Sequence, residues 1–228
     1  MFKMNILNSD HTVVDALNLK TRQRLLEAAG EVFATVGFRN ATIREICKRA
    51  HANVAAVNYH FHDKEALYSA VLQYTHQCAV EKYPPNLGLG DNATAVQRLR
   101  AFIRSFLLRF FDEGRPAWHG KLMAREMIEP THALDALVEN EIRPNSQLLE
   151  LIVLELLDFR ANNEFVQLCV RSIVSQCVFY HHARPVINLL YPDQKYHRED
   201  IERLTDHITR FSLGALKEFK KQLRIKKK

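Results

Sequence analysis

A Glu-x-x-His sequence at 129–132 has the spacing with which di-iron helical bundles place a carboxylate and an imidazole on one helix face. That chemistry needs a second such motif, and the sequence contains none. Pro130 also disfavours a position inside a helix. The histidine pairs that begin at His60 and His181 have no cysteine near enough to complete a zinc pattern. Phosphate-binding glycine loops and the Gly-x-Ser-x-Gly motif are missing too, so we expect no catalytic residue, metal or cofactor.

Residues 54–61 carry another kind of chemistry, hydrogen bonding to the edges of bases. Around its apolar positions this segment has small or polar residues and no acid. Asn58 has the amide that pairs bidentately with adenine, and Ala55 and Ala56 are small enough to pack against thymine methyl groups. Such a face suits the DNA major groove. Tyr59 and His60 are expected to meet the DNA backbone or base edges.

Two short helices must position that face. Thr42 and Glu45 form a predicted capping box, in which the Thr42 hydroxyl accepts from the Glu45 amide and the Glu45 side chain reaches back. The helix that they open is about nine residues long, and its N-terminus also offers a phosphate site. After a three-residue turn beginning at His51, Asn53 is a suitable N-cap for the second helix. This pattern predicts a helix-turn-helix, with a plain helical hairpin as the alternative.

Three motifs at fixed spacing carry a family resemblance: ATIREI at 41–46, Asn53 three residues after Ala50, and YHFHDKEAL at 59–67. They resemble the N-terminal domain of the TetR family of transcriptional regulators, from about residue 20 to 74. The resemblance implies that Lys64 contacts a phosphate. Many relatives have Gly at the position of His51, so His51 is expected to adopt a positive φ. The expected DNA-contacting residues are Thr42, Arg44, Asn53, Ala55, Ala56, Asn58, Tyr59, His60 and Lys64.

Helical periodicity continues along the whole chain, with no sustained alternation typical of strands. We expect an all-α protein of about nine helices. The clearest break is the Pro- and Gly-containing stretch 83–90, which predicts a linker. Residues 1–19 are therefore expected to form a flexible N-terminal arm, 20–82 a helix-turn-helix DNA-binding domain, and 83–228 a larger effector-binding and dimerisation domain. Pro144 is expected to kink or break a long pattern at 131–158.

The second domain also resembles a known subgroup. Trp118, the LMARE sequence at 122–126, EPT at 129–131 and SQCVFY at 175–180 are similar to CecR-like regulators, whose C-terminal helices form a dimer interface and an effector pocket. The resemblance implies a small, partly apolar effector. The charges of Arg125 and Glu126 need either a ligand or partners within the chain. The candidate pocket residues are Phe106, Phe110, Trp118, Met123, Arg125, Glu126, Met127, Gln176 and Phe179, for which ordinary core packing is the alternative.

Residues 165–180 are too apolar to face water, which predicts a homodimer built on this helix and the final one. The net charge is +6, and segment 20–64 alone has eight basic residues against four acids, as DNA binding requires. For the basic stretch 217–228 a solvated, frayed helix end is the favoured interpretation. The four scattered cysteines suit a reducing cytoplasm, and no apolar run approaches the ~18 residues of a membrane span.

We therefore expect a DNA-binding transcriptional repressor that binds a palindromic operator, double-stranded DNA with two symmetric half-sites, as a dimer. A small-molecule effector is expected to release it. The alternatives are a helical protein-interaction module and a di-metal helical-bundle enzyme, neither of which would bind DNA. The local positive charge and the capped short helices favour the regulator.

Overall fold

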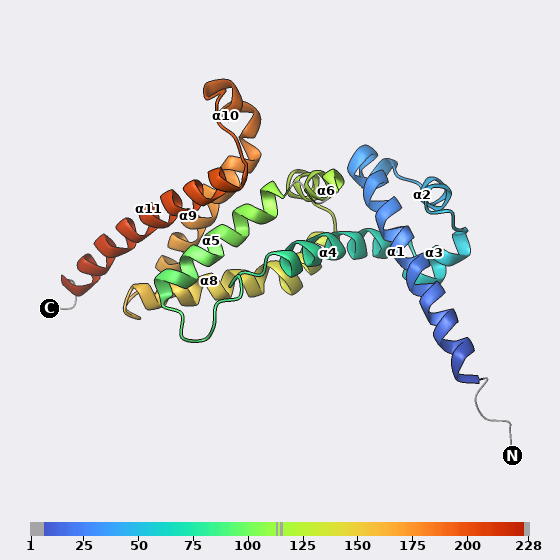
Figure 1. Ribbon diagram of the computed structural model, residues 1–228, viewed down its shortest axis with the longest axis horizontal. Coiled ribbons are helices and arrows are strands. Elements are labelled where there is room, and N and C mark those ends of the chain that lie inside the picture. Colours follow the sequence, from blue (N-terminus) through green and yellow to red (C-terminus); the bar gives the residue numbers. More distant parts are fainter. Residues whose placement is uncertain (1–6, 113, 115, 226–228) are drawn as a thin grey trace, which may run out of the picture. The chain divides into compact units, whose positions relative to one another are not determined.

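The computed structural model describes residues 7–112, 114 and 116–225 (Figure 1). Within these ranges all regular structure is helical, which confirms the all-α prediction. The described residues form eleven α-helices and one π-helical turn, η1, rather than about nine helices. They are α1 (Leu7–Asn40), α2 (Ile43–Ala50), α3 (Val54–Phe61), α4 (Lys64–Lys82), α5 (Ala95–Phe111), α6 (Ala117–Ile128), α7 (Ala133–Leu137), η1 (Val138–Ile142), α8 (Arg143–Leu156), α9 (Asn163–His182), α10 (Arg184–Leu190) and α11 (Arg198–Ile225).

The additional helices arise at two prolines. Pro144 and Pro185 both lie in the first turn of a helix, α8 and α10, where a missing N–H costs nothing. The long pattern at 131–158 is consequently divided into α7, η1 and α8. Each proline thus starts a new helix, as expected for the break predicted at Pro144.

The chain folds into two compact units whose boundaries differ from the predicted ones. The first unit comprises the chain up to His76 together with 115–137, and the second comprises 77–114 and 138–228. The expected linker at 83–90 therefore lies inside the second unit. Residues 7–19, expected to be a flexible arm, are helical and belong to α1, while residues 1–6 lie outside the described residues.

The core of the first unit explains why α6 belongs to it. Trp118 and Leu122 are buried among residues of α1, α2, α3 and α4, including Phe33. Gly30 of α1 allows the close approach, because a Cβ at this position would lie 2.2 Å from the Trp118 ring. Burial of a tryptophan is a large hydrophobic contribution. Although α6 follows α5 directly in the sequence, it packs in the first unit and α5 belongs to the second.

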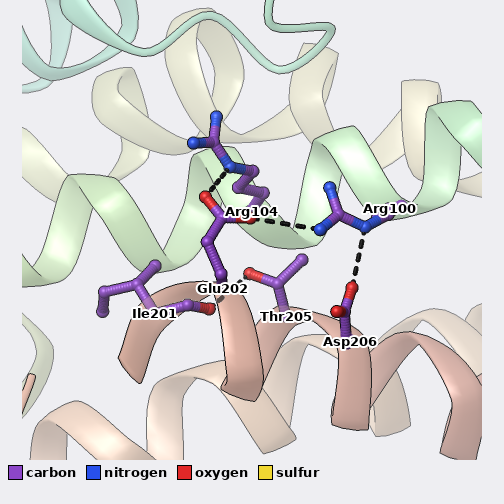
Figure 2. A network of polar contacts seen from close by, with 6 residues as sticks. All are labelled: Arg100, Arg104, Ile201, Glu202, Thr205 and Asp206. Atoms are coloured by element: carbon purple, nitrogen blue, oxygen red, sulfur yellow. Dashed lines mark hydrogen bonds and ion pairs between the residues drawn. The ribbon is translucent and has the colours of Figure 1, made fainter. Parts of the chain in front are cut away.

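The second unit is a helical bundle of α5, α8, α9 and α11 with its own apolar core. A charged network joins α5 to α11: Glu202 accepts from Arg104 Nε at 2.5 Å and from Arg100 Nη2 at 3.1 Å, and Asp206 accepts from Arg100 Nε at 2.9 Å (Figure 2). The short helix α10 stands out from the end of α9 in Figure 1. Over the described part of the chain, no helix is both long and apolar enough to cross a bilayer.

Candidate nucleic-acid interface

Helix α2 begins with one half of the predicted capping box. The Thr42 hydroxyl caps the helix by accepting from the Glu45 amide at 3.2 Å. The Glu45 carboxylate, however, accepts from Arg49 Nε at 3.0 Å, so it serves an ion pair one turn along the same helix. Ile46 and Cys47 are buried, whereas Thr42 and Arg44 are exposed. The outer face of α2 is therefore basic and available to a phosphate.

The turn between α2 and α3 is tight and strained at one residue. His51 adopts φ 48° and ψ 48°, the left-handed conformation expected where relatives have glycine. Ala52 N–H donates to the Cys47 carbonyl at 3.0 Å and so closes the end of α2. Asn53 then caps α3, because its side-chain oxygen accepts from the Ala56 amide at 2.8 Å. These caps hold the angle at which α3 leaves the turn.

Helix α3 separates a buried face from a polar one. Val57 and Phe61 are buried in the core of the first unit, and Ala56 is half-buried against it. Ala55 and Asn58 are exposed, and the Tyr59 side chain is 71% exposed. The side chain of Tyr59 is thus accessible to DNA together with those of Ala55 and Asn58. Of the expected thymine contacts, Ala55 is the more accessible.

His60 completes this surface. Its ring lies edge-on to Tyr59, with centroids 4.9 Å apart, and it is half-buried. Burial lowers the pKa of the His60 imidazole, and the nearby Arg22 charge lowers the pKa further. The lowered pKa favours the neutral imidazole, which has one ring nitrogen as donor and the other as acceptor.

The junction between α3 and α4 has a feature that the sequence did not reveal. His62 has φ 70° and ψ −55°, and the Asp63 amide donates to the Phe61 carbonyl at 2.9 Å, which defines a γ-turn. Asp63 then caps α4 by accepting from the Ala66 amide at 2.7 Å. This compact turn places the first residue of α4, Lys64, directly after the exposed end of α3.

Lys64 lies against the end of α1. Its ammonium group donates to the carbonyl oxygens of Ala41 at 3.0 Å and Arg39 at 3.5 Å, and sits 4.6 Å from the centre of the Phe38 ring. The contact at 3.5 Å is at the limit of a hydrogen bond. The side chain is half-buried, so Lys64 holds the α1–α2 connection in addition to any contact with DNA.

The expected effector residues do not form one pocket inside either unit. Trp118, Met123, Arg125, Glu126 and Met127 belong to the first unit, and the other four belong to the second. The sequence signal was helical spacing of aromatic and methionine residues, which is the same for core residues and for a pocket. Because α6 belongs to the first unit, the nine residues are divided between the two units.

Glu126 is fully buried, and its partners lie within the chain. Its carboxylate accepts from the Tyr68 hydroxyl at 2.7 Å, from the Thr131 amide at 2.8 Å and from the Thr131 hydroxyl at 3.0 Å. Burial and these contacts with Glu126 raise the pKa of Tyr68 far above its usual range, so Tyr68 remains a donor. Arg125 lies beside Gly37 and 3.8 Å from Glu129. For Glu126 the alternative of pairing within the chain is the one found.

The four candidates in the second unit lie on two helices, Phe106 and Phe110 on α5 and Gln176 and Phe179 on α9. Phe106 and Phe110 pack edge to face, with centroids 5.0 Å apart, and Phe110 stacks on His181. Gln176 bonds to the Ser172 carbonyl, and Phe179 is exposed. A cavity of about 400 Å³ does exist in this unit, but it lies between α5 and the start of α11 and is lined by none of the nine expected residues.

The Glu-x-x-His sequence is not part of a metal site in the structure. Within the described residues no group of three or more His, Cys, Asp or Glu side chains could hold an ion. Glu129 and His132 are exposed on a segment between α6 and α7. The di-metal alternative therefore has no support from the geometry.

A helix-turn-helix followed by a helical bundle defines a class of bacterial DNA-binding regulators, and comparison with known families agrees. Residues 25–71 match the family model of bacterial regulatory proteins of the tetR family. Residues 95–216, more than half of the chain, match the C-terminal domain of the HTH-type transcriptional dual regulator CecR. The chain belongs to the TetR family and has a CecR-type C-terminal domain. It is thus a DNA-binding transcriptional regulator, in a family of regulators rather than enzymes.

Individual proteins support the assignment over most of the chain. The dual regulator CecR of Shigella flexneri is 26% identical over 198 residues, which cover 83% of this chain and 88% of CecR. The fatty acid degradation regulator FadR from Bacillus halodurans has a similar fold, with a TM-score of 0.61 and 14% identity. The match covers 85% of this chain and 95% of FadR. AibR in complex with isovaleryl coenzyme A and operator DNA is similar as well, with a TM-score of 0.60 and 18% identity. The match covers 83% of this chain and 96% of AibR.

Proposed function

We propose that this regulator is a cytoplasmic repressor that binds a palindromic operator as a homodimer and is released by a small-molecule effector. The exposed polar face of α3 carries the proposal. Asn58, Tyr59 and Ala55 are accessible there, while Val57 and Phe61 anchor the helix in the core. A helix with one buried and one polar, acid-free face is the arrangement that reads the major groove.

The homodimer is supported by an apolar surface on the second unit. Leu168 of α9 and Phe211 of α11 are 51% and 64% exposed. They line a groove of about 340 Å³ between the two helices, together with Phe165 and Phe219. Large apolar side chains gathered on neighbouring helices mark a protein interface. A second copy that presents the same two helices would bury this surface in a four-helix arrangement.

Effector control is supported by the structural neighbours. AibR, which has a similar fold, was solved with both isovaleryl coenzyme A and operator DNA. A ligand can shift only an equilibrium between states that it binds unequally. In a dimer the two α3 helices must enter major grooves one turn apart, about 34–36 Å, so a modest change in their separation is enough to release the operator.

Selection of binding sites from a random duplex library tests the proposal, followed by fluorescence anisotropy on the selected site. We expect a palindrome whose half-sites are centred about 10 base pairs apart, or a multiple of this, with at least ~10³-fold preference over scrambled DNA. The variant Asn58→Ala/Tyr59→Ala should lose the preference, while Leu151→Ala, an exposed substitution on α8, should keep it. Enrichment of no sequence, or equal preference in the α3 variant, would refute DNA reading by this face.

A further inference from the structure

The cavity between α5 and the start of α11 has the features of a binding site for a small organic acid. Its volume is about 400 Å³, within the range of small-molecule sites. One part of its wall is apolar and is formed by Leu108, Phe111 and Ile201. Another part is polar and includes Arg104 and Arg198. An amphipathic ligand fits such a divided lining better than a purely apolar or purely polar one.

Arg104 is oriented by its neighbours in a way that leaves its outer edge available. The side chain is only 22% exposed, and Nε donates to Glu202. Figure 2 shows the two terminal nitrogens of Arg104 turned away from Glu202 and from α11. Within the described residues these nitrogens make no hydrogen bond. A guanidinium fixed at Nε presents a planar fork of donors, which matches the two oxygens of a carboxylate.

The described side chains that line the cavity leave an excess of positive charge. Asp112 also lines it, but the Asp112 carboxylate accepts from Lys82 Nζ at 2.7 Å and from the Gly114 amide at 3.0 Å. Glu202 is shared between Arg104 and Arg100. Arg198, the first residue of α11, is exposed and has no acidic partner in the described part of the chain.

Tyr196 provides an independent sign that a ligand belongs here. This side chain lines the cavity, is 8% exposed and stacks on Phe111, with centroids 4.4 Å apart. Its buried hydroxyl has no hydrogen-bond partner among the described residues. Burial raises the pKa of Tyr196, so the hydroxyl remains a neutral donor. A buried hydroxyl without a partner costs free energy, and a shift of the ring that turns the hydroxyl toward a ligand oxygen in the adjoining cavity would recover it.

We propose that this cavity binds a small carboxylate with an apolar body, with its oxygens at Arg104 and its apolar part against Leu108, Phe111 and Ile201. The assignment of this carboxylate as the effector rests on the proposed repressor function. It differs from the nine-residue pocket expected from the sequence. In the sequence, the arginines of α5 are indistinguishable from ordinary surface charges. Only the packing of α11 against α5 shows that Arg104 lines a cavity.

Calorimetric titration of the full-length protein tests the site, with hexanoate and phenylacetate as probes and hexanamide and phenylacetamide as neutral controls. We expect the acids to bind at least ~10-fold more tightly than the amides, because a charged group gains more from Arg104. Arg104→Gln should weaken binding of the acids by about 10–100-fold. Arg100→Gln is the matched control, since Arg100 shares Glu202 but does not line the cavity, and it should bind the acids as the unmodified protein does.

A second variant keeps the test decisive if Arg104→Gln fails to fold. Tyr196→Phe removes only a hydroxyl that lacks a partner, so the thermal midpoint should hold or rise while affinity for the acids falls by about 2–10-fold. Equal binding of acids and amides, or unchanged affinity in both variants, would overturn the carboxylate site.

Operator affinity measured in parallel separates this inference from the proposed function. Release of the operator by the acids in the unmodified protein, but not in Arg104→Gln, supports the effector assignment. Acid binding that leaves operator affinity unchanged overturns that assignment. If the protein binds its operator but binds none of the acids, the carboxylate site is wrong and the repressor function stands.

Discussion

Lys64 shows how one side chain combines a structural contact with a proposed DNA contact. Its ammonium group donates to the Ala41 and Arg39 carbonyls, yet it remains half-buried rather than enclosed. An ammonium group has three donors, so at least one remains for a phosphate oxygen. The family motif predicted only the phosphate contact, because the two carbonyls are 23 and 25 residues away in sequence.

Lys64→Ala is expected to change both stability and DNA binding. Loss of the charge-assisted bond to the Ala41 carbonyl should lower the free energy of unfolding by about 1–3 kcal/mol, measured by urea denaturation. Binding becomes weaker as salt is added, and the slope of log affinity against log salt concentration counts the phosphate contacts. Loss of one contact should reduce the size of this slope by about one per subunit, on operator and scrambled DNA alike. An unaltered salt dependence with lowered stability would show that Lys64 is a structural residue alone.

Asn58 and Tyr59 are expected to differ from Lys64, because they contact base edges and so distinguish sequences, whereas a phosphate contact only positions the protein on the DNA. Asn58→Ala should reduce discrimination at one symmetric pair of base pairs by about 1–3 kcal/mol and leave the salt dependence unchanged. Tyr59→Phe should cost about 0.5–1.5 kcal/mol of operator affinity through loss of one hydroxyl contact. Binding measured against a set of single-base operator variants checks both. If Asn58→Ala keeps its base preference, Tyr59 and Ala55 are the residues that recognise the bases.

At the scale of helices, local signals predicted local structure well. The caps at Thr42 and Asn53 are formed by residues three positions apart, so the sequence shows them directly. The positive φ of His51 followed from the same short-range pattern. By contrast, the packing of α6 on α1 depends on the contact between Gly30 and Trp118, 88 positions apart, which no periodicity reveals. The cavity at Arg104 was missed for the same reason.

Gly30→Ala tests the contact between α1 and α6. The added Cβ would lie 2.2 Å from the Trp118 ring, so one helix must shift, and we expect a loss of about 1–3 kcal/mol in the free energy of unfolding. Gly214→Ala is the matched control. A Cβ at Gly214 meets nothing within 4 Å, and alanine in a helix is favoured over glycine by about 0.5–1 kcal/mol, so this variant should be stabilised. Equal effects at the two sites would contradict the close packing at Gly30.

For the molecule as a whole, the predicted homodimer depends on the exposed apolar surface of α9 and α11. Leu168→Glu should place a charge in the proposed interface and convert the dimer to monomer at micromolar concentration, as measured by equilibrium sedimentation. Leu151→Glu changes a residue on α8 that is 60% exposed and should leave the dimer intact. A monomeric unmodified protein, or equal effects of the two variants, would contradict this interface.

The inclusion of α6 in the first unit has a consequence for how the protein is synthesised. The core around Phe33 needs Trp118 and Leu122, which follow the end of α3 by more than 50 residues. On a ribosome that adds about 5–20 residues per second, the stretch from His76 to Leu137 takes roughly 3–12 s to appear. During that time the nascent helix-turn-helix exposes the face of α1 that α6 later covers. The core of the DNA-binding unit is therefore completed only after the whole of α5, a helix of the other unit, has been synthesised, and an N-terminal fragment that ends at His76 would lack Trp118 and Leu122 from that core.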